Sequence, residues 1–212
     1  MLKVFAFSTP NSVRIPIALE ELGLEYEIEP INVRKGEQKW PNYLAINPNG
    51  KVPVLVDNDG PGGEPITLTE SGAILIYLAE KAGRLLPSAG AVRARTFEQL
   101  LFHLTAIGPA LGQLGFFKRQ ASEEIPVAIA RFQTESDRVL AVLDRVLAQR
   151  QYAAGGEFTI ADIAHFGWLW RREFAGVNLD GFPNIERWYR GVEGRPAVQR
   201  GIQRVTALVP TD

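Results

Sequence analysis

The sequence predicts an α/β domain followed by an all-helical domain. Short apolar runs alternate with helix-like segments up to about residue 84. A Gly- and Pro-containing stretch follows, and beyond it apolar residues recur mainly at helical spacing. We therefore expect an α/β domain over residues 1–84, a linker over 85–92 and an all-α domain over 93–212.

The first elements predict a strand–helix–strand unit. Residues 2–7 form a short apolar run that ends in polar residues, which is typical of a strand. From Ser12 the apolar spacing becomes helical, and Gly23 is suited to end that helix in a left-handed conformation. Residues 26–33 read as a second strand.

The rest of the α/β domain predicts a short helix, a hairpin and a longer helix. The polar stretch 34–40 leads to a short helical segment before Asn47. Two strands, 52–56 and 65–68, flank a Gly-rich turn, and a helix follows over about 71–81. The order βαβ-α-ββα predicts a mixed sheet.

The second domain reads as helices throughout. Residues 91–117 and 123–149 are long helix-compatible segments, and Gly108-Pro109 should bend or break the first. Thr159 and Asp162 have the spacing of a capping box, which predicts a helix over about 160–174. Further helices are expected over 185–192 and after Pro196.

Composition excludes several classes of function. Lys and Arg total 23 against 24 Asp and Glu, which gives no basic surface for nucleic acid or an anionic membrane. There is no cysteine, so any thiol chemistry must come from a bound small molecule. The two histidines are far apart in sequence, and we expect no metal site. We find no leader-like or membrane-spanning apolar run, which favours a cytoplasmic protein.

Two blocks of sequence resemble the glutathione transferase superfamily. The first runs from Asn47 to Val56 as NPNGKVPVLV, and the second from Leu68 to Leu78 as LTESGAILIYL. Thr9-Pro-Asn11, residues 35–38 and residues 45–48 are most similar to the bacterial nu class. The resemblance is close over residues 1–84 and looser beyond. It implies a thioredoxin-like N-terminal domain, glutathione as co-substrate and a homodimer.

The resemblance implies sites for the peptide part of glutathione. Ser71 and the free N–H groups that begin its helix would bind the γ-glutamyl carboxylate, with Glu70 facing the ammonium. These two residues could instead only cap the helix. A cis Val52-Pro53 bond would expose the Val52 main chain to the cysteinyl backbone. The alternative is a trans proline that starts an edge strand.

Three further residues are implied at the carboxylate ends of glutathione. Lys51 and Gln38 would meet the glycyl carboxylate, although either could be an ordinary surface residue. Arg131 falls in a family pattern whose arginine reaches bound glutathione with a bidentate fork. A solvated arginine on a helix surface is the alternative for Arg131.

The thiol end of the site departs from the commoner family pattern. There is no Cys, and no Tyr precedes Tyr26, so neither can hold the sulfur after the first strand. The resemblance assigns this role to the Thr9 hydroxyl and the Asn11 amide, as donors that favour a thiolate. Ser8 or Ser12 could replace Thr9 as donor, and Asn11 could be only a helix cap.

The sequence thus predicts a glutathione-dependent enzyme. Thiol–disulfide exchange needs an attacking thiolate, and without a protein cysteine that thiolate must be glutathione itself. We expect a disulfide-bond reductase that binds one or two glutathiones and a small disulfide. Conjugation to small electrophiles and peroxide reduction would use the same thiolate and remain alternatives. A non-catalytic interaction module of the same fold is the third.

Overall fold

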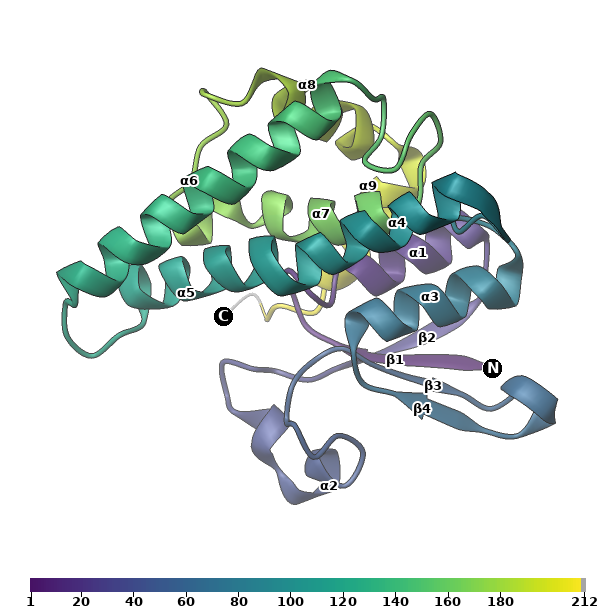
Figure 1. Cartoon of the computed structure of the whole chain (residues 1–212). Coiled ribbons are helices and arrows are strands. Elements are labelled where there is room, and N and C mark those ends of the chain that lie inside the picture. The colour runs from purple at the N-terminus through teal and green to yellow at the C-terminus, as the bar shows by residue number, and fades with distance from the viewer. Residues whose placement is uncertain (211–212) are drawn as a thin grey trace. The chain divides into compact units, whose positions relative to one another are not determined.

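The computed structural model describes residues 1–210 and divides into two compact units (Figure 1). The first unit comprises Met1–Arg84 together with the chain from Arg195 onward, and the second comprises Leu85–Gly194. The first therefore contains the sheet, and the second is helical. This is the predicted combination of an α/β and an all-α region.

The first unit is built on a mixed four-stranded sheet in the order β2-β1-β3-β4. β1 and β2 are parallel because α1 connects them, whereas β3 pairs antiparallel with both β1 and β4. The mixed sheet is as predicted, although β2 is shorter than expected. The strands are β1 (Leu2–Ala6), β2 (Tyr26–Pro30), β3 (Val54–Asp57) and β4 (Ile66–Leu68).

Helices lie on both faces of this sheet, with α1 and α3 on one face and α2 beyond the other (Figure 1). On the α2 face, Tyr43 packs with Phe5 and Val54 in one apolar cluster. α1 ends at Gly23, whose φ of 70° is left-handed, so this predicted stop is confirmed. The elements are α1 (Arg14–Leu22), η1 (Glu37–Lys39), α2 (Pro41–Leu44), η2 (Pro61–Gly63) and α3 (Ser71–Ala82).

The last helix, α9 (Pro196–Thr206), packs with α1 in the first unit. The sequence predicts this helix as part of the helical domain of residues 93–212, because its apolar spacing shows only that it is helical. Its partner is decided by long-range contacts. Arg195 Nε lies 2.6 Å from Glu21 Oε1, and a β-carbon on Gly201 would stand 2.7 Å from the Ile17 backbone nitrogen. This close approach requires glycine.

The second unit begins with one long helical run that contains a π-helical turn. The Gly108 N–H donates to the carbonyl of His103, five residues back, and Pro109 has no N–H to donate. The predicted irregularity is therefore present, but the helix continues through it. The elements are α4 (Gly90–Phe102), η3 (His103–Ile107), α5 (Gly108–Arg119), α6 (Pro126–Ala148), α7 (Ile160–Trp170), η4 (Arg172–Ala175) and α8 (Pro183–Glu193).

The same run, Gly90–Arg119, is long and apolar enough to cross a membrane by length and composition alone. This corrects our expectation that no segment approaches that limit. Its most apolar window has a mean hydropathy of 1.4, and 44% of the window is buried inside the protein. A core helix of a soluble protein passes the same test, so the feature is weak evidence for a membrane span.

The predicted capping box at the start of α7 is confirmed. The Thr159 N–H donates to Asp162 Oδ2 at 2.9 Å. Asp162 also accepts from the Ala153 N–H and from Trp188 Nε1, at 2.8 and 2.9 Å. The carboxylate therefore joins α7 to the preceding loop and to α8, in addition to capping its own helix.

Candidate functional site

Three strand ends of the first unit meet at one edge of the sheet. Phe5 near the end of β1 pairs with Val54 at the start of β3, and Leu55 pairs with Leu68 at the end of β4. The segments that follow β1, precede β3 and follow β4 therefore begin side by side. These segments carry Thr9, Asn11, Lys51, Val52, Pro53, Glu70 and Ser71.

The loop between β1 and α1 holds the predicted sulfur donors. The N-cap position of α1 is Val13, and no side chain caps that helix, so Asn11 is not the cap. The Asn11 side-chain oxygen is buried and has no hydrogen-bond partner among the described residues. Since an amide carries both an acceptor and donors, this buried amide is available to a ligand.

The two serines of this loop differ in exposure. Ser12 is fully buried, and its hydroxyl lies 3.0 Å from Thr9 Oγ1. Ser8 is half-buried. The Ser12 hydroxyl is already paired with Thr9 Oγ1 and the Phe7 N–H, so we favour Thr9 over Ser12 as the direct sulfur donor. Thr9, which is half-buried, keeps that possibility.

The start of α3 forms a second polar corner. Glu70 occupies the N-cap position, but neither its side chain nor any other caps the helix. Glu70 is exposed, whereas Ser71 is buried. The alternative that these residues merely cap α3 therefore finds no support in the hydrogen bonding. The unpaired N–H groups of the first turn, together with the helix dipole, favour an anion at this corner.

Arg14 completes this corner and was missed by the sequence analysis. Its Nη1 donates to Ser71 Oγ at 2.9 Å, and the side chain is only 1% exposed. Burial lowers the pKa of Arg14 to about 9, so the guanidinium is still charged at pH 7. The available signal was a charged residue in the apolar run that follows Ser12. Its partner lies 57 positions away, so local spacing could not reveal the pair.

The Val52-Pro53 peptide bond is cis, which confirms the prediction. Val52 precedes the first paired residue of β3, so its main chain lies beyond the sheet register. The preceding Lys51 carbonyl accepts hydrogen bonds from Tyr43 Oη at 2.7 Å and from Asn47 Nδ2 at 2.8 Å. Burial raises the pKa of Tyr43 to about 12, so its phenol is protonated and donates at neutral pH. These contacts hold the approach to the cis bond in one conformation.

Gln38 lies next to this segment through a close contact with Gly50. A β-carbon on Gly50 would stand 3.0 Å from the Gln38 carbonyl oxygen and 2.8 Å from Lys39 Nζ. The φ of Gly50 is 61°, which also requires glycine. The Gln38 side-chain oxygen is buried without a hydrogen-bond partner among the described residues. Lys51 itself is exposed.

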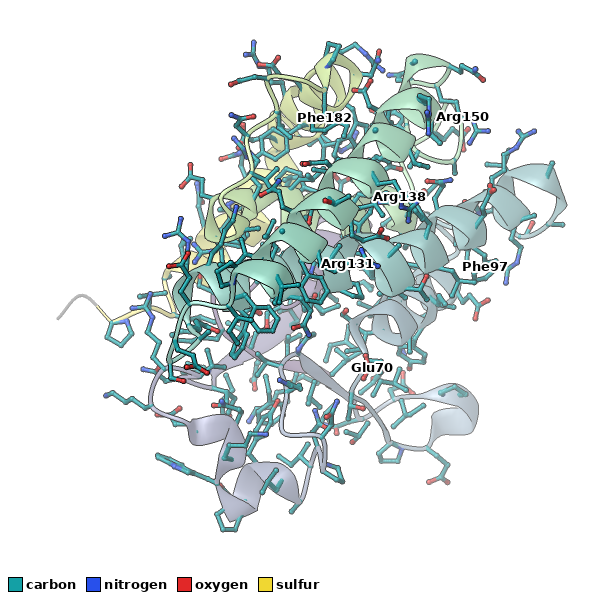
Figure 2. All side chains as sticks on the ribbon, turned by 60° about the vertical axis from the view of Figure 1, so that its left-hand side comes forward. Glu70, Phe97, Arg131, Arg138, Arg150 and Phe182 are labelled. Carbon is teal, nitrogen blue, oxygen red and sulfur yellow. The ribbon has the colours of Figure 1, made fainter. Side chains whose placement is uncertain are left out.

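Arg131 belongs to the second unit, on α6, whereas the residues above belong to the first. Its side chain is 65% exposed, and Nη1 lies 3.6 Å from Glu135 Oε2. Arg138, two helical turns further along α6, pairs with the same glutamate (Figure 2). An exposed pair of this kind contributes little to stability.

The polar atoms of this edge define a site for an anionic peptide-like ligand. It offers a buried cation, a helix start that no side chain caps, a main-chain segment beyond the strand register and, among the described residues, two amide oxygens without a partner. Among residues 1–210, no three His, Asp or Glu side chains gather as a metal site would require. The fold that carries the site is a thioredoxin-like sheet followed in sequence by a helical unit.

Comparison with known families agrees with this class. Residues 1–80 match the family described as Glutathione S-transferase, N-terminal domain, and residues 110–196 match its C-terminal domain. The chain belongs to the glutathione transferase family, and it is a glutathione-dependent enzyme of that family.

Relatives match over nearly the whole chain. The disulfide-bond oxidoreductase YfcG of Escherichia coli is 38% identical over 205 residues, which is 95% of this chain and 94% of the relative. A glutathione transferase family member from Pseudomonas fluorescens, solved with two glutathiones bound, is 40% identical with a TM-score of 0.90. That match covers 95% of this chain and 92% of the other. A glutathione transferase from Pseudomonas putida, solved with one glutathione disulfide per subunit, has the same identity and TM-score over 95% and 90%.

Proposed function

We propose that this protein is a disulfide-bond reductase that uses the thiolate of bound glutathione. The observation that carries the proposal is the Asn11 amide, which caps no helix and whose oxygen has no partner among the described residues, in a chain that has no cysteine. Burying a polar atom without a partner is costly, so the amide oxygen favours a ligand donor, while the amide Nδ2 group can donate to the ligand sulfur. YfcG, named a disulfide-bond oxidoreductase, supports this choice of reaction.

The peptide part of glutathione is proposed to bind along the edge described above. Ser71 and the start of α3 would take the γ-glutamyl carboxylate, and exposed Glu70 would take its ammonium. The Val52 main chain, presented by cis Pro53, would pair with the cysteinyl backbone. Buried Arg14 adds a positive charge behind Ser71, which strengthens the site for an anion without touching it.

The other end of glutathione is proposed to meet Gln38 and Lys51. The Gly50 contact keeps these two residues together, and the Gln38 amide has a buried oxygen that needs a partner. The glycyl amide N–H can donate to that oxygen, and the glycyl carboxylate can pair with the Lys51 ammonium.

The proposed reaction consumes two glutathiones for each disulfide. Thr9 and Asn11 would donate hydrogen bonds to the sulfur of the first glutathione and lower its pKa, which raises the thiolate fraction. This thiolate attacks one sulfur of the substrate, a new S–S bond forms, and the substrate S–S bond breaks. The leaving thiolate takes a proton from solvent. A second glutathione thiolate then attacks the mixed disulfide, releasing the other substrate thiol and leaving glutathione disulfide.

Reduction of 2-hydroxyethyl disulfide by glutathione tests the reaction. We expect robust turnover that falls in Thr9→Ala and Asn11→Ala, while glutathione still binds. Asn58→Ala is the matched control, because Asn58 is exposed and lies outside the site. Tight glutathione binding without disulfide reduction would contradict the proposal. An electrophile and peroxide panel would then separate a conjugating enzyme or peroxidase from a non-catalytic module.

Arg131 is proposed to bind a carboxylate of glutathione through its guanidinium fork. Its ion pair with Glu135 is as long as 3.6 Å, and its high exposure leaves donors of the guanidinium available. We expect Arg131→Ala to raise the KM for glutathione about tenfold, equivalent to roughly 1.4 kcal/mol. Arg138→Ala is the matched control on the same helix, since both arginines pair with Glu135. Equal KM values for the two variants would rule out this role for Arg131.

We also propose that the protein is a cytoplasmic homodimer. Reduced glutathione is kept in reducing compartments, where a glutathione-dependent reductase without disulfides would work. Light scattering during size-exclusion chromatography should give twice the chain mass of 23.4 kDa. A mass of one chain would contradict the homodimer, and recovery of the protein outside the cytoplasmic fraction would contradict the cytoplasmic location.

A further inference from the structure

The hydroxyl groups of half-buried Thr9 and buried Ser12 form a hydrogen-bonded pair at the proposed sulfur site. Their oxygens are 3.0 Å apart. The Ser12 N–H also donates to Thr9 Oγ1, at 3.1 Å, and the Phe7 N–H donates to Ser12 Oγ, at 3.4 Å. Thr9 therefore has two contacts to one residue, and those contacts fix the orientation of its side chain.

Either hydroxyl can donate in this pair, because hydroxyl protons rotate to suit their surroundings. The two arrangements differ in what they leave unsatisfied. If Thr9 donates to Ser12, the Ser12 proton needs another acceptor in a place with no exposed surface. If Ser12 donates to Thr9, its proton is satisfied and the Thr9 proton is released from the pair. Among the described residues, Thr9 Oγ1 is the side-chain oxygen recorded beside the Ser12 hydroxyl.

We propose that Ser12 is a positioning residue that donates to Thr9 and thereby directs the Thr9 proton to the glutathione sulfur. This rests on the proposed function, in which Thr9 holds the sulfur. Thr9 Oγ1 would then accept from both the N–H and the O–H of Ser12 while donating once, to the thiolate. A hydroxyl that accepts such bonds is a stronger donor, because hydrogen bonds in a chain polarise one another.

The proposed role of Ser12 differs from direct contact with the glutathione sulfur. Ser12 was one alternative to Thr9 as the atom that touches sulfur. Its hydroxyl is already paired with the Phe7 N–H and with Thr9 Oγ1, and its distance from Thr9 fits action through Thr9. The two roles differ in one consequence: a positioning serine has no effect on the thiol once Thr9 is removed.

The test measures the pKa of the bound glutathione thiol by recording thiolate absorbance as a function of pH. We expect Thr9→Ala to raise this pKa by about one unit, or tenfold in the thiolate equilibrium. Ser12→Ala should raise it by about half a unit, roughly threefold. In the Thr9→Ala background, Ser12→Ala should cause no further change. Ser136→Ala is the control for loss of a buried serine hydroxyl, since Ser136 is fully buried on α6 and should leave the pKa unchanged.

A second pair of variants protects the test against a folding failure of Ser12→Ala. Ser12→Thr and Ser12→Val have the same shape and differ by the hydroxyl, so the valine variant alone should show the raised pKa. An unchanged pKa in Ser12→Ala beside a raised one in Thr9→Ala would overturn the role of Ser12 and leave Thr9 in place. Equal shifts from Ser12→Ala in both backgrounds would also overturn it. An unchanged pKa in Thr9→Ala would instead remove Thr9 from the proposed site, and the Ser12 proposal with it.

Discussion

The starts of α1 and α7 contain similar residues that have different roles. Each is preceded by a threonine, with an amide or acid side chain nearby, Asn11 in one case and Asp162 in the other. At α7 the Asp162 carboxylate accepts from Thr159, Ala153 and Trp188, so its hydrogen bonding is closed. At α1 no side chain caps the helix, and the Asn11 oxygen has no partner among the described residues.

This difference distinguishes a structural network from a binding site. Burial raises the pKa of Asp162, and its donors oppose that effect by stabilising the carboxylate. Such a group stabilises the fold only while every partner is present. The loop before α1 instead keeps the buried Asn11 oxygen without a partner among the described residues, which costs stability and leaves that oxygen available to a ligand. The comparison predicts that substitutions at α7 reduce stability and those at α1 reduce activity.

The largest expected effect is at Asp162. Asp162→Ala leaves the Ala153 N–H and Trp188 Nε1 buried without their acceptor, each costing about 1–3 kcal/mol, and removes the cap of α7 as well. We expect a loss of about 3 kcal/mol or more in the free energy of unfolding, measured by urea denaturation. The folded variant should leave the pKa of the bound glutathione thiol unchanged. A loss below about 1 kcal/mol would contradict the structural role of the Asp162 network.

The next effect is on catalysis, at Asn11. Asn11→Ala removes a donor to the thiolate in the proposed site, and a hydrogen bond to a charged group contributes about 1.5–3 kcal/mol. Disulfide reduction should fall about tenfold to a hundredfold, measured as kcat/KM at pH 7. Because Asn11 caps nothing and its oxygen is unpaired, the free energy of unfolding should change by less than about 0.5 kcal/mol. A large stability loss with normal activity would show that the loop is structural.

A smaller stability effect is expected at Thr159. Thr159→Ala removes the side chain of the capping box and leaves Asp162 to its other donors, so α7 should lose about 1 kcal/mol. Thr9→Ala is the paired variant, since Thr9 stands at the corresponding approach to α1. It should change glutathione-dependent activity more than the urea midpoint. The reverse ranking in either variant would contradict the division between the two helix starts.

The smallest effect concerns Asp57, a fully hydrogen-bonded carboxylate in the same unit as the loop before α1. The Asp57 carboxylate, 1% exposed, accepts from Tyr77 Oη at 2.6 Å and lies 2.8 Å from Lys81 Nζ. Burial opposes ionisation, but the bonds from Lys81, Tyr77 and the Asp59 N–H outweigh it and lower the pKa of Asp57. Because the folded pKa lies below the ordinary 3.8, this stabilisation is present above pH 3.8 and is lost as pH falls through the folded value.

Lys81→Met should therefore destabilise the protein at pH 7 by less than about 1 kcal/mol, since Lys81 is partly exposed. The difference from wild type should shrink as pH falls from about 4 through the lowered folded pKa of Asp57, because Asp57 is protonated in both proteins only below that value. Urea denaturation at several pH values measures this. A difference that is independent of pH would mean that Lys81 acts by packing, and Glu80→Gln on the neighbouring exposed position is the control for loss of a charge.

Local structure followed from the sequence where neighbouring residues decide it. The capping box of Thr159 and Asp162 and the helix stop at Gly23 depend on residues within one or two turns. The cis Val52-Pro53 bond was predicted from a resemblance in a short segment. The structure differs from the prediction at two positions. Helix α7 ends at Trp170, before the predicted boundary, and a π turn accommodates Pro109. Spacing alone does not specify how a helix ends or adapts.

The sequence by itself determined that any thiol must come from a ligand, because the chain has no cysteine, and that an α/β region precedes a helical one. Only the tertiary structure decided which polar groups are satisfied. Arg14 meets Ser71 across 57 positions, and Trp188 meets Asp162 across 26. Periodicity reports which face of an element is apolar, whereas the partner of a buried polar atom depends on how elements pack. The Asn11 oxygen, which has no partner among the described residues, could therefore be recognised only in the folded chain.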